Sequence, residues 1–395
     1  MDRACSLWNA LTITLTALIL SGCVSVAERN PLPAELVDAV SVPGGEYARF
    51  WGDISPHYID DWFALSDEAL RARHPAIIGR DHHYLAISGG GQEGAFGAGL
   101  LCGWTQSGTR PEFTFVTGIS TGALMAPFAF LGPEYDELIE QIYTTTSTRD
   151  ILDPRSLIGT LTSNAMASSE PLKTTLERVI TADIVEAIAL EHRKGRSLFI
   201  GTTNLDAGRP VHWDIGEIAN SGDPGSLDLI RQILLASASI PGIFPPVLIE
   251  VEADGKIFDE MHVDGGTSEQ LFFFPAGIDW NRVLDKLDVT NTPNLYLIRN
   301  SRIDPVYTPV DNELFAISDR SVSSMIRSQG IGNLYEIYMM AARDKLEYHL
   351  AYIPRDFVAP QEERFDPGYM KTLFDLGFEL AKEGYEWKRR PPRFE

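Results

Sequence analysis

The pattern of apolar and polar positions predicts an irregular start followed, from about residue 81, by regularly alternating strands and helices. Short apolar runs bounded by turn residues predict strands at residues 84–88, 113–117, 197–203, 211–213, 247–251 and 294–299. Longer stretches predict helices at residues 96–104, 123–131, 227–237, 321–342 and 369–385. This alternation indicates an α/β fold, with a mainly parallel central sheet and helices on its faces.

The segment before residue 81 divides into three parts. Residues 1–22 contain a short apolar run, which is shorter than the about 20 residues that a membrane span needs and fits a signal peptide. Residues 23–45 hold prolines and glycines among small residues and are interpreted as an anchor and linker. Residues 46–80 carry tryptophan and phenylalanine and are expected to form an arm that packs on the domain. Residues 81–395 contain no internal repeat or second linker and are interpreted as one catalytic domain.

The apolar run ends in Leu20-Ser21-Gly22-Cys23, which resembles a bacterial lipobox. The resemblance implies cleavage before Cys23 and lipidation of this cysteine, so that several acyl chains hold the protein on a membrane. It implies a location in the bacterial cell envelope, and Val24 resembles the residue found in lipoproteins sent to the outer membrane, facing the periplasm. An ordinary signal peptide or a buried first helix is the alternative interpretation.

The composition is that of a globular protein with a large acidic excess. Of 395 residues, 44% are hydrophobic and 22% charged, which excludes a disordered tail or a multi-span membrane protein. The 33 basic and 55 acidic residues give a formal net charge of −22, which argues against a nucleic acid partner. Outside the signal and anchor, Cys102 is the one remaining cysteine, so no internal disulfide is expected. No cysteine pair or histidine cluster indicates a metal, and no cofactor is expected.

A G-x-S-x-G motif, Gly118-Ile119-Ser120-Thr121-Gly122, lies between a predicted strand and a predicted helix. Such a turn holds the serine in a strained conformation with its hydroxyl exposed at the end of the sheet. The amino terminus of the following helix favours negative charge nearby. Ser120 is therefore a candidate nucleophile, and a tight turn with a capping serine is the alternative.

Two glycine-rich motifs accompany this serine. Gly89, Gly90 and Gly91 end the first predicted strand, where unshielded backbone N–H groups can hold a phosphate or an oxyanion. The Lys-Ser or Lys-Thr pair of a phosphate-binding loop is absent, so an oxyanion hole is the better interpretation. Asp264 stands in Val263-Asp264-Gly265-Gly266, which presents a carboxylate on a tight turn, although a hairpin turn is the simpler interpretation of that motif alone.

Together, the three motifs resemble the patatin-like phospholipase family, over about residues 84 to 266. Residues 236–246 are also similar to the stretch that precedes the family's aspartate. The resemblance implies a three-layer α/β/α fold and a Ser–Asp dyad, with Ser120 as nucleophile, Asp264 as general base, and Gly89, Gly90 and Gly91 as the oxyanion hole. It implies a serine lipid acyl hydrolase of phospholipase A or lysophospholipase type, acting without a cofactor on phospholipid or another fatty acyl ester.

The sequence departs from the family pattern at two places. Glu93 stands where the family usually has Arg or Lys, and the residues after Asp264 lack the family's nearby Asn and Pro. The loss of a positive charge weakens transition-state stabilisation or changes substrate preference. It also removes a cation that would depress the pKa of Asp264, which helps an aspartate to act as a base.

Several alternatives remain open on the sequence alone. His349 or His262 is an alternative base in a triad, although His349 is expected to lie in a strand. A soluble-ester esterase or thioesterase, or a non-catalytic envelope lipoprotein, is an alternative function, and the oligomeric state is open. Trp104, Phe128, Phe130 and residues 272–274 are core or acyl-pocket candidates. We expect the run 272–274 to face a pocket or membrane, because three consecutive aromatic residues are not expected to share one core.

Overall fold

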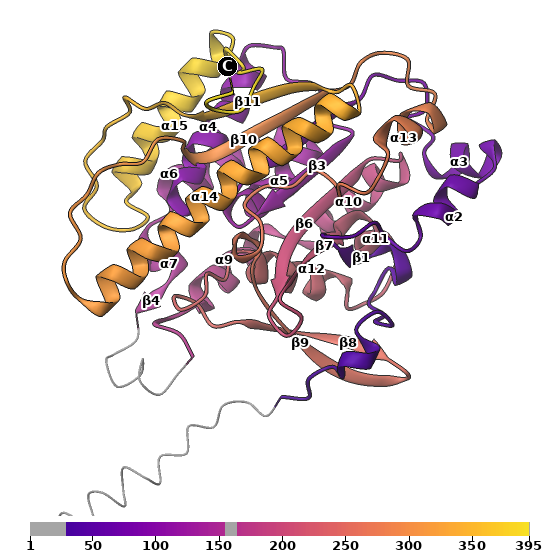
Figure 1. The fold of residues 1–395 in the computed structure, drawn as a ribbon, viewed down its shortest axis with the longest axis horizontal. Helices are drawn as coiled ribbons and strands as arrows, with labels where there is room; N and C mark the ends of the chain where they lie inside the picture. The colour runs from indigo at the N-terminus through magenta and orange to yellow at the C-terminus, as the bar shows by residue number, and fades with distance from the viewer. Residues whose placement is uncertain (1–28, 155–163, 395) are drawn as a thin grey trace, which may run out of the picture.

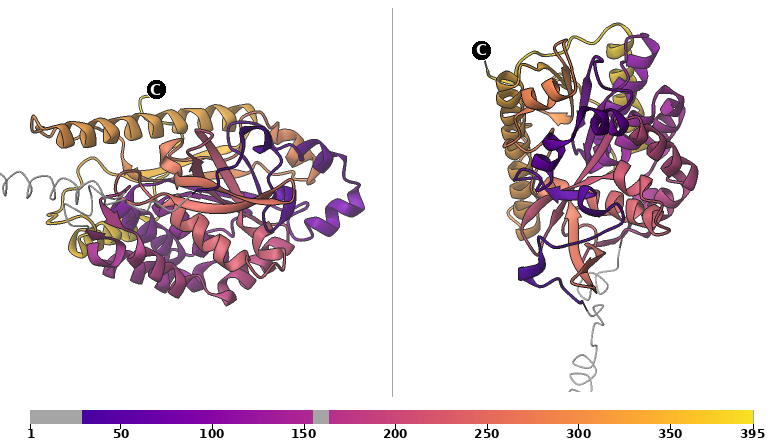
Figure 2. Two further views of the ribbon diagram at one scale, coloured as in Figure 1. Left: turned by 90° about the horizontal axis from the view of Figure 1, so that it is seen from below. Right: turned by 90° about the vertical axis from the view of Figure 1, so that its right-hand side faces the viewer.

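A computed structural model describes residues 29–154 and 164–394 of the chain. Figure 1 shows a central sheet with helices on both sides, and the two turned views in Figure 2 show these layers from other directions. The predicted α/β fold with a mainly parallel central sheet is confirmed. The predicted signal peptide and Cys23 lie outside the described residues.

The central sheet runs in the order β1-β7-β6-β3-β2-β10-β11. Its parallel part consists of β2 (His83–Ile87), β3 (Phe115–Ile119), β6 (Ser197–Asn204), β10 (Asn294–Arg302) and β11 (Glu347–Ile353). Antiparallel strands extend one side: β1 (Arg49–Trp51), β7 (Arg209–Asp214), β8 (Val247–Ala253) and β9 (Lys256–Asp264). A separate small sheet pairs β4 (Asp153–Pro154) with β5 (Ala167–Ser168).

Alternate residues of the parallel strands enter two different cores. Leu85 and Ile87 of β2 pack into the core on one face, whereas Tyr84 and Ala86 pack into the core on the other face. This division follows from the two-residue period of a strand. Because both faces are covered by helices, β2 and the first halves of β6 and β10 are largely apolar, whereas β6 and β10 end in buried polar residues such as Thr202, Asn204 and Asn300.

Most helices cover one face of the sheet. These are α4 (Gly94–Gln106), α5 (Thr121–Leu131), α6 (Asp136–Thr145), α7 (Thr148–Ile151), α9 (Glu170–Val179), α10 (Ala182–Arg193), α11 (Ile215–Asn220), α12 (Ser226–Ser237) and α15 (Pro367–Lys382). The core on the other face includes residues of α2 (Ile59–Ala64), α3 (Asp67–Arg73), α13 (Trp280–Lys286) and α14 (Leu314–Arg343). In Figure 2, α14 runs along this second face and extends past the sheet. None of the described helices is long and apolar enough to cross a membrane.

The first described residues lie against the β8–β9 hairpin. Ser41 and Glu252 exchange backbone hydrogen bonds of 2.7 and 3.0 Å, and the Leu32 N–H donates to the Asp259 carbonyl at 3.2 Å. Further along, β1 pairs with β7 and so joins the edge of the sheet. The segment expected to be a linker is thus bound to the hairpin over its described part.

The aromatic run 272–274 packs into the core with α13. The expectation that it faces a pocket or membrane is therefore wrong for Phe272 and Phe273, which are buried. Phe272 stacks on His212 with ring centroids 3.7 Å apart, and Phe273 contacts Trp280 at 4.7 Å. Phe274 also contacts Trp280, at 5.1 Å, and it lines only a small internal cavity. The segment is neither strand nor helix, so its successive side chains do not alternate between faces. Trp104, Phe128 and Phe130 are likewise buried in the core.

Candidate active site

Ser120 occupies a sharp turn between the end of β3 and the start of α5. Its backbone lies at φ 54° and ψ −123°, a conformation that non-glycine residues rarely adopt and that costs on the order of 1–3 kcal/mol. The flanking glycines are required by close packing. A Cβ atom on Gly122 would lie 2.3 Å from the Ile87 carbonyl oxygen, and one on Gly118 would lie 2.5 Å from the Gly122 carbonyl oxygen. The turn therefore presses the start of α5 against the end of β2.

Asp264 reaches Ser120 from the end of β9. The Ser120 hydroxyl donates a hydrogen bond of 2.6 Å to Oδ2 of Asp264. The other carboxylate oxygen accepts from the Gly266 N–H at 2.7 Å, so that both oxygens have defined partners. Pairing of β9 with β6 and a backbone bond of 2.9 Å from Asp264 N–H to the Ser239 carbonyl fix this position.

Burial shifts the protonation equilibrium of Asp264. The residue is only 4% exposed, and burial raises the pKa of its carboxyl to about 7. The hydrogen bonds from Ser120 and Gly266 oppose this shift but are smaller effects. A pKa near neutrality is suited to a general base, because the carboxylate is available and still has appreciable affinity for a proton.

Neither histidine considered as a base contacts Ser120. His262 shares hydrogen bonds of 3.0 Å with Thr202 and with Glu260. His349 lies in β11, as the sequence predicts, and its Nε2 atom is 2.8 Å from Oδ1 of Asn294. The geometry therefore pairs the serine directly with an aspartate.

Ser237 supports the serine turn from α12. Its hydroxyl accepts a hydrogen bond of 3.0 Å from the Ser120 N–H and donates one of 2.6 Å to the Gly201 carbonyl. The hydroxyl of Ser237 thus ties the turn to β6. In the sequence, residues 236–246 are similar to the family's stretch before the aspartate, but that similarity assigns no role to Ser237. The signal that could have identified it is a serine at the apolar end of a predicted helix, where a buried hydroxyl needs a hydrogen-bond partner.

The three predicted glycines lie beside Ser120, but their N–H groups differ. The Gly89 N–H donates to the Gln270 carbonyl at 3.2 Å and is therefore occupied. The Gly90 and Gly91 N–H groups form no hydrogen bond with another described residue. Gly90 packs so closely on β10 that a Cβ atom would lie 2.0 Å from the Asn300 carbonyl oxygen. Of the three glycines predicted to form the oxyanion hole, only Gly90 and Gly91 thus have free backbone N–H groups among the described residues.

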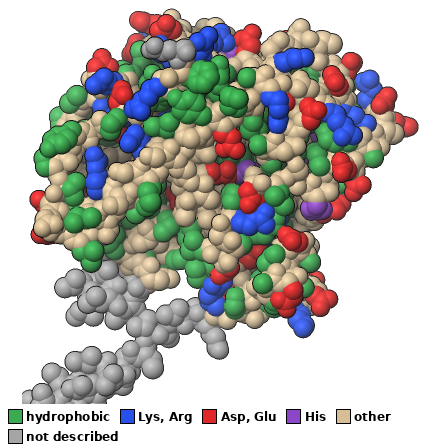
Figure 3. All heavy atoms as spheres, in the orientation of Figure 1, with side chains coloured by type: hydrophobic (Ala, Val, Ile, Leu, Met, Phe, Trp, Pro, Cys, Tyr) green, Lys and Arg blue, Asp and Glu red, His purple; other side chains and the backbone are tan. Residues whose placement is uncertain are grey.

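A groove of about 890 Å³ opens at this site. Ser120, Asp264 and the glycine loop line its inner end, and the carboxyl end of β10 with residues 320–329 of α14 lines the rest. Three large apolar side chains of this lining are exposed: Val306, Val322 and Met325. Further exposed apolar side chains follow Val306 in the chain and begin α14: Tyr307, Val310, Leu314 and Ile317. Figure 3 shows hydrophobic and basic side chains interspersed on the face that α14 crosses.

Glu93, which replaces the basic residue expected in the glycine loop, also lines this groove. Burial raises the pKa of Glu93 to about 7, against the opposing effect of Arg302 and Arg299. The arginines that face this carboxyl come from β10 and not from the loop. The structure thus places positive charge in the groove on a different element from the one the family pattern predicts.

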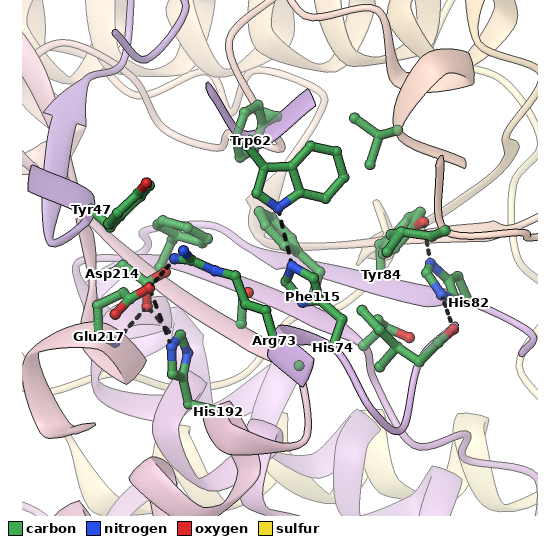
Figure 4. A pocket seen from close by; sticks show the side chains of 18 of the residues that line it. Tyr47, Trp62, Arg73, His74, His82, Tyr84, Phe115, His192, Asp214 and Glu217 are labelled. Atoms are coloured by element: carbon green, nitrogen blue, oxygen red, sulfur yellow. Dashed lines mark hydrogen bonds and ion pairs between the residues drawn. The ribbon is translucent and has the colours of Figure 1, made fainter. Parts of the chain in front are cut away.

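A second cavity, of about 130 Å³, lies at the opposite ends of β2, β3 and β6. Figure 4 shows its polar side chains close together, with Trp62 donating to His74 at 3.0 Å. Arg73 and His192 both pair with Glu217. The Nδ1 atoms of His74 and His192 and the Nε1 atom of Trp280 in this lining have no hydrogen-bond partner in the described part of the chain. The cavity is much smaller than the groove at Ser120, so the groove is the stronger candidate site. Among the described residues, no cluster of His, Cys, Asp or Glu is arranged to hold a metal ion.

Comparison with known proteins agrees with the geometry. Residues 85–276 match the family described as patatin-like phospholipase, and this range contains the glycine loop, Ser120 and Asp264. Among solved structures, VipD from Legionella pneumophila is similar over 78% of this chain and 67% of that chain, with 12% sequence identity and a TM-score of 0.39. A similarity at that level supports no conclusion about function. Comparison with curated proteins gave no match. Residues 85–276 of this chain form a patatin-like phospholipase domain, which supports lipid acyl hydrolysis as its general activity.

Proposed function

We propose that this chain is a serine lipid acyl hydrolase, of phospholipase A or lysophospholipase type, in which Ser120 is the nucleophile and Asp264 the general base. The observation that carries the proposal is the 2.6 Å hydrogen bond from the Ser120 hydroxyl to the buried Asp264 carboxylate. A serine becomes a useful nucleophile only when a base within hydrogen-bond reach accepts its proton. The strained turn supports the same role, since strain concentrates at functional sites.

The reaction proceeds in two halves. Ser120 Oγ bonds to the ester carbonyl carbon while its proton passes to Asp264, and the carbonyl oxygen becomes an oxyanion. The bond to the leaving alcohol then breaks, and Asp264 returns the proton to that oxygen, which leaves an acyl-enzyme. Water then attacks the acyl carbonyl carbon while Asp264 takes its proton; the bond to Ser120 Oγ breaks, Asp264 returns the proton to Oγ, and the fatty acid is released.

The oxyanion is assigned to the Gly90 and Gly91 N–H groups. These donors line the groove beside Ser120 and have no described partner, so they are available to developing negative charge. They lie on a loop held against β10 by the close contact of Gly90 with Asn300. Donors that are already oriented stabilise a transition state without reorganisation.

A fatty acyl substrate is favoured over a small soluble ester by the site's surroundings. The groove of about 890 Å³ is large enough for part of a lipid, and the exposed side chains of Val306, Val322 and Met325 are in its lining. Leu314 is 85% and Met325 63% exposed, an arrangement suited to contact with a lipid surface. These features support the lipid substrate and leave head-group preference to experiment.

The decisive experiment measures fatty acid release from phospholipid and lysophospholipid vesicles by the protein and by Ser120→Ala. We expect release that disappears in the variant, together with labelling of the protein, but not of the variant, by a serine-directed fluorophosphonate. Hydrolysis of short nitrophenyl esters alone would instead identify a soluble-ester esterase. A folded protein that neither labels nor hydrolyses would be a non-catalytic lipoprotein.

We also propose that Cys23 is lipidated and holds the protein in the bacterial cell envelope, at the outer membrane facing the periplasm. The motif Leu20-Ser21-Gly22-Cys23 supports this proposal, and these residues lie outside the described structure. With a net charge of −22, the protein is not drawn to anionic lipid by its charge, so acyl chains would supply the attachment. Fatty acid labelling and membrane fractionation of Cys23→Ser, compared with Cys102→Ser, test this assignment.

A further inference from the structure

Arg299 is a buried guanidinium with very few partners. Its side chain is 3% exposed, and its Nε atom has no hydrogen-bond partner among the described residues. Its hydrogen bond to another described residue is long, at 3.5 Å from Nη2 to the Arg327 carbonyl. A buried charge without partners is costly, so natural proteins normally pair it or use it to bind a ligand.

The surroundings of Arg299 do not supply a paired carboxylate. Among the described residues, no carboxylate forms an ion pair with Arg299, although the charge of Glu93 acts on it. Glu93 is itself shifted by burial to a pKa of about 7, so near neutral pH it carries only part of a negative charge. Burial lowers the pKa of Arg299 to about 10, which still leaves the guanidinium charged.

The chain holds Arg299 firmly beside the glycine loop. On one side of it in β10, the Ile298 carbonyl accepts from the Ser88 N–H at 2.9 Å. On the other side, Asn300 donates its N–H to the Ser88 hydroxyl at 2.8 Å and its side-chain amide to the Ser88 carbonyl at 3.0 Å. The guanidinium is covered by α14 at Gly330, where a Cβ atom would lie 2.4 Å from Nη1. The groove containing Ser120 therefore has a cation at a fixed position.

The groove is also more basic than the rest of the protein. Its lining includes Arg299, Arg302, Arg320 and Arg327 against the acids Glu93, Asp264 and Asp304. The chain as a whole has 33 basic and 55 acidic residues, and its net charge of −22 would repel a free anion. The excess of arginine at the reaction site is thus opposite in sign to the net charge of the chain.

We propose that Arg299, with Arg302 beside it on β10, forms a binding site for an anionic phosphodiester of the substrate, next to the ester that Ser120 attacks. Arg302 also donates to the Phe357 carbonyl at 2.6 Å and to the Arg355 carbonyl at 3.4 Å, so Arg299 supplies most of the free donors. The planar fork of a guanidinium matches phosphate oxygens bidentately, and a partly dehydrated arginine binds them more strongly than an exposed one. The inference rests on the proposed function. It adds the requirement that a good substrate carries its phosphate within reach of β10.

The test compares a phosphate-bearing and a neutral substrate. For Arg299→Met, we expect kcat/KM for a lysophospholipid to fall by roughly 10- to 100-fold more than kcat/KM for a neutral nitrophenyl ester. Arg299→Lys keeps the charge but not the fork and should recover part of this difference. Arg193→Met removes an exposed arginine from α10, away from the groove, and should leave both rates unchanged. Equal losses for the two substrates in Arg299→Met would overturn the inference.

Binding measurements separate failure of the inference from failure of the proposed function. Glycerophosphocholine and inorganic phosphate are titrated calorimetrically into Ser120→Ala, with and without Arg299→Met. Binding of the diester that is lost with Arg299 supports the site even if no ester is hydrolysed. Binding of inorganic phosphate alone indicates a free-anion site and overturns the lipid assignment. Should Arg299→Met unfold at a lower temperature, Arg302→Gln provides the second variant, with the same expected difference between substrates.

Discussion

The hydroxyl of Ser120 donates to Oδ2 of Asp264 across 2.6 Å, although 144 positions separate the two residues in the chain. The serine stands at the end of parallel strand β3, whereas the aspartate ends antiparallel strand β9. Both strands pair with the same edge of β6, β3 along Ser197–Gly201 and β9 along Thr202–Asn204, while β7 pairs with the other edge. The contact therefore depends on β6, which pairs in parallel with β3 and in antiparallel with β9.

Replacement of Asp264 by asparagine should leave the fold intact and reduce kcat by roughly 10²- to 10⁴-fold, because the amide cannot accept the serine proton. Rates on a lysophospholipid and the rate of fluorophosphonate labelling measure the effect. Asp254→Asn is the matched control. It makes the same change at an exposed turn with φ 51°, which asparagine tolerates, and should retain full activity. Full activity in Asp264→Asn would contradict the role of this carboxylate as base.

The dependence of activity on pH should reflect the raised pKa of Asp264. Because the base must be ionised, kcat/KM on a neutral ester is expected to rise through about pH 7 and to level off at higher pH. Profiles between about pH 5 and about pH 9 measure this. Glu93 also has a pKa of about 7, so the profile of Glu93→Gln distinguishes the two groups. A profile that is flat down to pH 5 in both proteins would contradict the assignment.

The same shift predicts how stability depends on pH. The pKa of Asp264 is raised from 3.8 to about 7 on folding, so its protonated form is favoured in the folded state. This contribution to stability is complete below about pH 4 and is lost as pH rises through about 7. Asp264→Asn should therefore gain in Tm relative to the wild type when pH is raised from 4 to 8. An unchanged Tm difference between the two pH values would refute this linkage.

The glycine loop offers a prediction about close packing. Gly90→Ala would place a Cβ atom 2.0 Å from the Asn300 carbonyl oxygen, so the loop must move and activity should fall by at least about 10²-fold. Gly255→Ala adds a methyl group in open space at φ 69°, in the turn between β8 and β9. It should cost on the order of 1–2 kcal/mol of stability without loss of activity. Rates and unfolding midpoints for the two variants test whether the loop position itself matters.

Ser237 is predicted to act through Ser120. Ser237→Ala removes the acceptor of the Ser120 N–H and the donor to Gly201, which should cost about 1–3 kcal/mol of stability and also lower kcat. Ser239→Ala is the control, since the Ser239 hydroxyl is equally buried but bonds only the Leu235 carbonyl in its own segment. A similar loss of stability is expected there, with a smaller loss of kcat. Equal losses of kcat in both variants would mean that Ser237 has only a structural role.

The predicted elements were most accurate for strands that pack against a core on both faces of the sheet. The central parallel strands β2, β3, β6 and β10 overlap predicted runs, because each contains three or more buried apolar residues. The strand β9 was not predicted, since Lys256, Asp259 and Glu260 interrupt its apolar pattern and pairing with β8 and β6 stabilises it. Helices α6, α9 and α10 were also missed, because they have only one buried face and many charged positions.

The sequence by itself determined the features that depend on neighbouring residues. These are the alternation of strands and helices, the turn at Ser120 and the glycine loop, since spacing and glycine content act over a few positions. Only the tertiary structure decided the Ser120–Asp264 hydrogen bond, the raised pKa of Asp264 and the unpaired burial of Arg299. Each of these depends on which distant segments pack together and exclude water. Desolvation and long-range contact are properties of the assembled sheet and its covering helices, and no local pattern encodes them.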